Sequence, residues 1–247
     1  MTYIFSFILG IIFGSFLNVI IYRIPKNLSI ALPRSYCPKC KETIPFYRNI
    51  PIFSFCIQCG KCAKCKNKIS LSYPITEFFT GLIFVVGFNM YNVPESIVFV
   101  LISSFLLTIA IIDYKLYIIP YQISLTILFI LIPYIILFSN TSYHLYGMLI
   151  GLSYLLSIFI ITWIVTKKQP IGFGDIQLII LLGLWLGPMK ILLTIFLAAC
   201  LGIFYWMILS MIYGYRRNLK LPFGTFLSIS SIIVYLIQLN WELFLGY

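Results

Sequence analysis

The chain has 247 residues, of which 62% are hydrophobic and only 9% are charged, and its net charge at pH 7 is +11. Its mean hydropathy is +1.05, whereas soluble domains usually carry about 25% charged residues. This composition excludes a soluble globular domain. Because the apolar segments are long and continuous, it also excludes the short alternating strands of a transmembrane β-barrel.

Eight apolar segments follow one another along the chain, and a helix that crosses a bilayer core needs about 20 such residues. The first has no clear signal-peptide cleavage site and is interpreted as a retained helix. The sixth is short enough to be kinked or re-entrant. The expected spans are 2–22, 75–92, 95–113, 120–138, 144–166, 174–187, 191–213 and 222–239. We therefore predict an all-α membrane protein, a polytopic bundle of about eight transmembrane helices.

The basic residues indicate the orientation of this bundle, because lysine and arginine concentrate in short cytoplasmic loops. With the N-terminus outside, sixteen of the seventeen lysines and arginines fall on the cytoplasmic side, and only Lys190 falls outside. An odd number of helices would place these charges on both sides. The net positive charge then reflects topology and contact with anionic lipid, and it gives no reason to expect nucleic acid as a partner.

The only long polar segment is 23–74, and it contains six of the seven cysteines in three Cys-x-x-Cys pairs. In a reducing cytosol such thiols are expected to bind metal rather than to form disulfides. Two pairs are enough for one tetrahedral zinc. We predict that 1–22 is the first membrane helix, that 23–74 is a cytoplasmic zinc-binding loop, and that 75–247 forms the rest of the bundle.

Two observations favour different pairs of ligands within this loop. Spacing slightly favours Cys56 and Cys59 as the second pair, since fifteen residues then separate the pairs instead of twenty-one. A local repeat favours the later pair, because 37–44 reads CPKCKETI and 62–69 reads CAKCKNKI, and zinc ribbons consist of two similar turns. The preferred structural zinc ligands are Cys37, Cys40, Cys62 and Cys65. Cys56 and Cys59 are either alternative ligands or unliganded thiols.

Few side chains elsewhere are able to perform chemistry. The single histidine, His144, is expected to be a solvated residue at the membrane interface, which excludes a Ser-His-Asp site on the cytoplasmic face. Cys200, in an apolar helix, is expected to be a small buried hydrophobe. The chain has only two aspartates, and the predicted topology places both at the cytoplasmic ends of helices. They are Asp113, at the end of the third span, and Asp175, which follows Gly-Phe-Gly at the start of the sixth.

Carboxylates next to an apolar bundle are costly and are usually functional. Two that share a site do not both ionise readily, so that one takes a proton from water while the other, protonated, hydrogen-bonds to a scissile carbonyl. This chemistry predicts an aspartic peptidase with Asp113 and Asp175 as its catalytic pair. A transporter with two ion-binding aspartates and a non-enzymatic assembly factor are the alternatives, but the two halves of the sequence show no convincing repeat.

Taken together, these features resemble the type IV prepilin peptidases, bacterial enzymes that cut the leaders of type IV pilins and pilin-like proteins. The resemblance covers essentially the whole chain, and it identifies Asp113 and Asp175 with the catalytic aspartates of the family. The matching stretches are 14–23 (GSFLNVIIYR), 49–54 (NIPIFS), 60–62 (GKC), 73–77 (YPITE), 119–120 (IP) and 172–175 (GFGD).

The resemblance also implies a location, a substrate and a second activity. The location is the bacterial inner membrane, with the active site toward the cytoplasm, and the substrates are prepilins. Family members with the long cysteine loop usually also methylate the new N-terminus, using S-adenosylmethionine. The sequence has no glycine-rich nucleotide loop after a strand, so the residues to inspect for the methyl donor are Gly14, Asn18, Glu77 and the cysteine loop.

Overall fold

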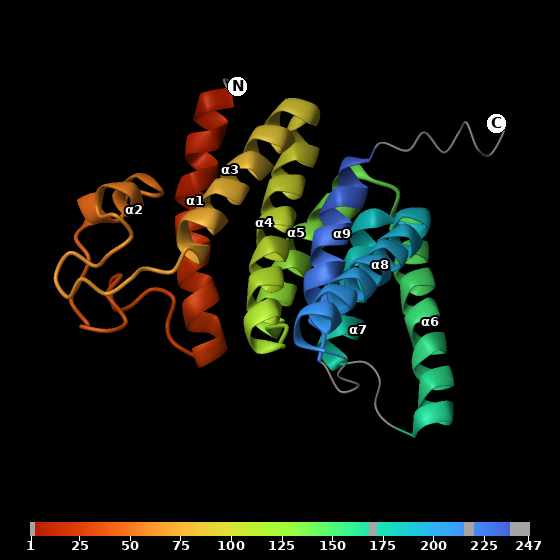
Figure 1. Ribbon diagram of the computed structural model, residues 1–247. Coiled ribbons are helices and arrows are strands. Elements are labelled where there is room, and N and C mark those ends of the chain that lie inside the picture. The colour runs from red at the N-terminus through yellow and green to blue at the C-terminus, as the bar shows by residue number, and fades with distance from the viewer. Residues whose placement is uncertain (1–2, 168–171, 215–219, 238–247) are drawn as a thin grey trace. The chain divides into compact units, whose positions relative to one another are not determined.

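Figure 1 shows the computed structural model of the protein, which describes residues 3–167, 172–214 and 220–237. These residues form helices and turns, with two isolated β-bridges in the cysteine loop and no strand among them. The helices are α1 (Tyr3–Arg23), η1 (Ile24–Lys26), η2 (Phe46–Arg48), α2 (Phe53–Ile57), α3 (Ser72–Met90), α4 (Val93–Leu116), α5 (Tyr121–Phe138), α6 (Thr141–Thr166), α7 (Phe173–Leu186), α8 (Pro188–Tyr213) and α9 (Phe223–Leu236).

Eight apolar helices lie where the hydropathy of the sequence places them, which confirms the predicted fold class. Six of them, α1, α3, α4, α5, α6 and α8, are long and apolar enough to cross a membrane. The other two, α7 and α9, have 14 residues each, or about 21 Å of helix, against a hydrocarbon core of about 30 Å. The short sixth segment was expected. The expected end of the eighth, Leu239, lies outside the described residues, as do Lys168, Arg216 and Arg217 of the orientation argument.

The chain forms two compact units, Met1–Ile112 and Asp113–Tyr247, with the division near the end of α4. In the first unit, α1 and α3 pack closely through small residues. A Cβ added to Gly10 would lie 2.7 Å from the Cα of Gly81, so only a glycine allows the two backbones to approach this closely. Further along the same interface, a Cβ on Gly14 would lie 2.8 Å from the Cα of Glu77.

In the second unit, α7 is the central helix and contacts α5, α6, α8 and α9. Its apolar residues are accordingly buried, with Leu178 and Ile179 fully inaccessible. A short helix surrounded in this way does not need to match the bilayer thickness, because its backbone and side chains are covered by protein. Burial begins at Leu178, whereas Phe173 at the start of α7 is exposed and Asp175 is half-buried.

His144 is not the solvated interface residue that the sequence suggests. It is buried, its Nδ1 lies 2.6 Å from the carbonyl oxygen of Leu184, and its Nε2 lies 2.6 Å from Oγ of Ser139. The last carbonyls of a helix have no partner within the helix, and Leu184 is in the final turn of α7. The histidine therefore ties the beginning of α6 to the end of α7.

Cys200 also differs from its expected environment, because it is exposed on α8 rather than buried. In a soluble protein an exposed cysteine on an apolar helix would be unusual. On a helix that crosses a membrane, the exposed face meets lipid, which is as apolar as a protein core. A small apolar side chain is therefore equally suited to the side of α8 that faces lipid and to the side that faces the protein.

Candidate active site and metal centre

Asp113 is near the end of α4 and is only 5% exposed. Its Oδ2 accepts two hydrogen bonds from Thr225, one from the backbone amide at 2.8 Å and one from the hydroxyl at 3.1 Å. Thr225 belongs to the first turn of α9. The carboxylate therefore occupies the N-terminal end of a helix, where amide groups without partners and the helix dipole both favour negative charge.

Gly224 makes this approach possible. A Cβ at this position would lie 3.1 Å from Oδ2 of Asp113 and 2.7 Å from Cδ1 of Ile119, so a side chain here would displace the carboxylate or the isoleucine. The sequence did not predict a role for Gly224 or Thr225 at the aspartate pair, because neither side chain is ionisable. The available signal was Pro222-Phe223-Gly224-Thr225, a small polar residue in the first turn of an apolar helix.

Asp175 lies in the first turn of α7, half-buried, where its amide donates to the carbonyl oxygen of Gly172 at 3.1 Å. It belongs to the same unit as Asp113 and interacts electrostatically with it. Ile119 lies between the surroundings of Asp113 and those of Asp175. A Cβ on Gly174 would lie 3.0 Å from the Cβ of Ile119, and Gly224 faces the Cδ1 of Ile119. Residues that are 62 positions apart in the sequence are thus brought to neighbouring places by the ends of α4 and α7.

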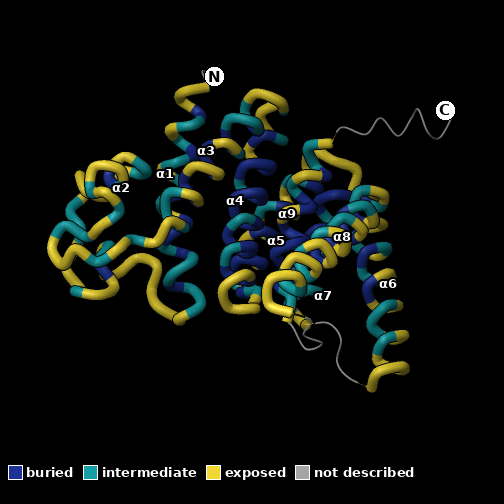
Figure 2. The backbone as a smooth tube through the Cα atoms, viewed as in Figure 1, coloured by how far each residue is buried: buried dark blue, intermediate teal, exposed yellow. Residues whose placement is uncertain are grey.

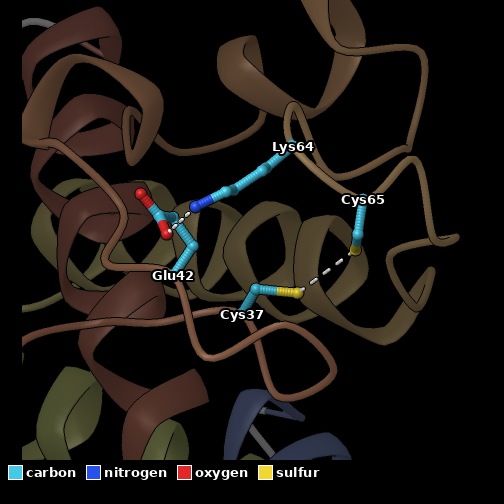
Figure 3. Close-up of polar contacts among 4 residues, drawn as sticks. All are labelled: Cys37, Glu42, Lys64 and Cys65. Carbon is cyan, nitrogen blue, oxygen red and sulfur yellow. Dashed lines mark hydrogen bonds and ion pairs between the residues drawn. The ribbon is translucent and has the colours of Figure 1, made fainter.

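A second cluster is formed by the cysteines that the local repeat favours. The sulfur atoms of Cys37, Cys40, Cys62 and Cys65 all lie within 4.8 Å of one another, and the Cys37 and Cys65 sulfurs are 3.9 Å apart (Figure 3). Four sulfurs bound tetrahedrally at about 2.3 Å from a zinc ion are about 3.8 Å apart. The cluster could therefore hold a metal ion. Cys56 and Cys59 are exposed free thiols outside it.

The two halves of this cluster are built alike, as the sequence repeat predicts. The amide of Cys37 donates to the carbonyl of Glu42, and the amide of Lys41 donates to the carbonyl of Cys37. In the second turn, Cys62 pairs with Asn67 and Lys66 with Cys62 in the same pattern. Lys41 and Lys66 both have φ of 56°. Each turn thus reverses the chain through a left-handed residue just after its second cysteine.

Electrostatics within the cluster favour a thiolate at Cys62. Backbone amides of Cys65 and Lys64 donate to its sulfur and lower the pKa of Cys62 to about 6. At Cys40 the backbone hydrogen bond at Glu42 acts in the same direction, but desolvation and the neighbouring thiols outweigh it and raise the pKa to about 11. Thiol groups that compete for protons in this way are expected at a metal site, where a bound cation takes the place of the protons. An exposed ion pair between Lys64 and Glu42 joins the two turns (Figure 3).

The residues considered for a methyl donor meet at the start of α3. Glu77 is buried and accepts a hydrogen bond from the amide of Ile52 at 2.7 Å through Oε2. Its Oε1 lies 3.4 Å from Nδ2 of Asn18, which also donates to the carbonyl of Tyr73 at 3.1 Å. These contacts connect the cysteine loop to α1 and α3. They give Asn18 and Glu77 a structural role, and the packing against α3 gives one to Gly14.

Two family models match successive parts of the chain. Residues 8–91 match the family described as the bacterial peptidase A24 N-terminal domain, and residues 99–207 match the type IV leader peptidase family. A type 4 prepilin-like proteins leader peptide-processing enzyme of Escherichia coli is 32% identical, over 93% of this chain and 91% of the relative. A prepilin leader peptidase/N-methyltransferase of Pseudomonas aeruginosa is 29% identical, over 94% and 89%. The corresponding protein of Neisseria gonorrhoeae is 28% identical, over 92% and 88%. No solved structure matches the chain.

Proposed function

We propose, because the chain belongs to the type IV leader peptidase family, that it is a membrane aspartic endopeptidase that removes the leader peptides of type IV prepilins and pilin-like proteins. The observation that carries this proposal is the pair of aspartates in one unit, at the adjoining ends of α4 and α7, which interact through their charges. Such a pair supplies both an acid and a base without a metal or a nucleophilic side chain.

The hydrogen bonds to Asp113 support an assignment of the two roles. The amide and hydroxyl of Thr225 stabilise a negative charge on Asp113, so Asp113 is the ionised member and Asp175 retains the shared proton. Asp113 takes a proton from the attacking water, and Asp175 hydrogen-bonds to the scissile carbonyl as its oxygen becomes negative. The tetrahedral intermediate then collapses as the departing amine receives a proton from the pair.

The membrane topology determines how a substrate reaches this pair. The family resemblance implies the bacterial inner membrane, and the positive residues on the loops favour an orientation with both aspartates on the cytoplasmic side. The apolar N-terminal helix of a prepilin would lie in the bilayer beside residues 75–247, while its short leader stays in the cytosol. The peptide bond between helix and leader would then be at the depth of Asp113 and Asp175.

We further propose that residues 23–74 form a separate metal-dependent loop. The sulfur spacing, the two matched turns and the donors to Cys62 suit a zinc ion held by Cys37, Cys40, Cys62 and Cys65. Four thiolates leave no open position, so this zinc would be structural and would fold a segment that is too small to have its own core.

Methylation of the new N-terminus, with S-adenosylmethionine as the donor, is a second activity that the names of the relatives support. When bound, the donor would supply an electrophilic methyl group for the amine that cleavage releases. Asn18 of α1 and Glu77 of α3, which the sequence suggested for the methyl-donor site, are hydrogen-bonded to each other, and Glu77 also accepts from Ile52. They would therefore act on this step through the position of the cysteine loop.

One experiment tests the peptidase proposal directly. The purified full-length chain in detergent is mixed with a prepilin-like substrate that has a leader and an apolar helix, and the products are identified by mass spectrometry. We expect a single cut between leader and helix, and, with labelled S-adenosylmethionine present, a methyl group on the new N-terminus. A substrate that remains intact would exclude the peptidase, whereas cleavage without methyl transfer would exclude only the second activity.

A further inference from the structure

The segment that precedes the second half of the metal cluster exposes an unusual number of large apolar side chains. Phe46 is 88% exposed, Phe53 60% and Ile57 66%. Phe53 and Ile57 are four residues apart, at the two ends of α2, and therefore lie on one face of this short helix. Figure 2 shows α2 and its neighbouring turns largely in the colour of exposed residues. Side chains of this kind are rarely left in water in such a cluster.

The contact between Glu77 and Ile52 establishes the depth of this segment relative to α3. This helix has 19 residues and is about 28 Å long, so all of it is needed to cross a hydrocarbon core of about 30 Å. Glu77 is the sixth residue of α3, about 7.5 Å along the axis from its start. The amide of Ile52, one residue before α2, is 2.7 Å from the Glu77 carboxylate. The start of α2 is therefore held at the level of the membrane surface rather than out in the cytosol.

The charge of the same loop points to the kind of surface that covers it. Between Ile24 and Leu71 the sequence has nine lysines and arginines but a single acidic residue, Glu42. The Arg48 guanidinium lies over the ring of Tyr47, 5.6 Å from its centre. Exposed aromatic side chains interleaved with basic ones are typical of segments that lie in the interface of an anionic membrane.

An open hollow in the loop is lined in part by basic side chains, which suit an anionic headgroup. It has a volume of about 650 Å³, and Arg34, Tyr47, Arg48, Lys64 and Glu42 are among the residues that line it. Lys64 is paired with Glu42, which leaves the two arginines as its excess positive charge. A guanidinium presents several donors to a phosphate in a fixed, planar geometry.

We propose that residues 46–57 form a lipid-contact surface, in which Phe46, Phe53 and Ile57 enter the acyl boundary while Arg34 and Arg48 bind the headgroup of an anionic phospholipid. This surface would orient the cysteine loop on the membrane in which α1 and α3 are embedded. It does not depend on the peptidase chemistry.

The test places a tryptophan at Phe53 or, separately, at Ile57 in the full-length protein, reconstituted in vesicles of phosphatidylcholine with or without phosphatidylglycerol. Lipids with brominated acyl chains quench tryptophan that reaches the acyl boundary, and the native tryptophans are subtracted with the unmodified protein. We expect the added emission of Phe53→Trp and Ile57→Trp to fall to about half in brominated vesicles that contain phosphatidylglycerol. Lys39→Trp, on the exposed first metal turn, is the matched control and should keep its emission.

Several outcomes decide the matter. Equal emission from all three variants in brominated and ordinary lipid would overturn the proposal. Quenching that does not require phosphatidylglycerol, or that persists when Arg34 and Arg48 are both replaced by Gln, would overturn the assignment to an anionic headgroup. An emission change that occurs only on addition of a prepilin-like peptide would assign the surface to substrate instead. We expect the same quenching when the tryptophan variants also carry Asp113→Asn. The lipid contact is thereby tested independently of the peptidase activity.

Discussion

One oxygen of Asp113, Oδ2, accepts hydrogen bonds from both the amide and the hydroxyl of Thr225, a residue 112 positions later in the chain. Two donors on one oxygen fix the rotation of the carboxyl group as well as its place. They also link the end of α4 to the start of α9, the last described helix. Because the donors belong to the first turn of a helix, these two hydrogen bonds stabilise negative charge on Oδ2.

Replacement of Asp113 or Asp175 by Asn is expected to lower the rate of prepilin cleavage by at least about 100-fold, because each change removes an acid or base from the reaction. The measurement is the rate of leader release by purified protein in detergent. Glu95→Gln, which removes a carboxylate at the opposite end of α4, is the control and should cleave normally. Retained cleavage in either Asp variant, at normal yield in the membrane, would remove that residue from the mechanism.

Thr225→Val keeps the backbone amide but removes the hydroxyl that donates to Asp113. A hydrogen bond to a charged group contributes about 1.5 kcal/mol or more, so kcat should fall about tenfold while KM changes little. Thr225→Ser retains the hydroxyl and should restore most of the rate. If the Val variant is as active as the unmodified protein, the hydroxyl has no part in positioning the carboxylate.

Gly224→Ala is expected to be more damaging than Thr225→Val, since its Cβ would approach Asp113 and Ile119 to 3.1 and 2.7 Å. The measurements are the cleavage rate and the thermal melting temperature in detergent. A small change in melting with a large loss of rate is expected, because the end of the Ile119 side chain can move aside, whereas even a small displacement of the Asp113 carboxylate disturbs the reaction. Gly202→Ala, where an added Cβ would lie 3.5 Å from the ring of Phe226 at ordinary van der Waals distance, is a control for glycine replacement outside the site. Normal cleavage by Gly224→Ala would contradict the close approach.

The double variant Cys62→Ser and Cys65→Ser should lose its bound zinc, because two sulfurs do not complete a tetrahedral site. Metal analysis of the purified protein is the measurement. The matched double variant Cys56→Ser and Cys59→Ser should retain one equivalent, since these thiols lie outside the cluster. Loss of zinc from both double variants would show that the ligand set is wrong.

Glu77→Ala should release the cysteine loop from α3 without loss of metal. It leaves the amide of Ile52 without its acceptor, and Ile52 itself has a φ of 59°, which is unfavourable for a β-branched side chain. The expected result is faster trypsin cleavage at the lysines of the loop. Glu77→Gln keeps an oxygen that can accept from Ile52 and should be affected less. Unchanged proteolysis in both variants would mean that other contacts hold the loop.

The sequence by itself determined the helices and their class, because about 20 consecutive apolar residues have few alternatives in lipid. Within the described ranges, eight apolar helices lie where hydropathy placed them. It also indicated which cysteines gather: the repeat in 37–44 and 62–69 is local, and a local repeat folds into two similar turns whatever surrounds it. The two aspartates were selected because the chain has no others.

Only the tertiary structure decided what surrounds these groups. Thr225 and Gly224 carry no charge, and they reach Asp113 only because α9 packs within the same unit. His144 was expected to be solvated because it lies near a helix end. In the structure its ring instead contacts the carbonyl oxygen of Leu184 at the end of α7, which has no partner within its own helix. In each case the partner is distant in the sequence, and an apolar helix gives no periodic signal of which neighbour it meets, since lipid and protein interior are equally apolar.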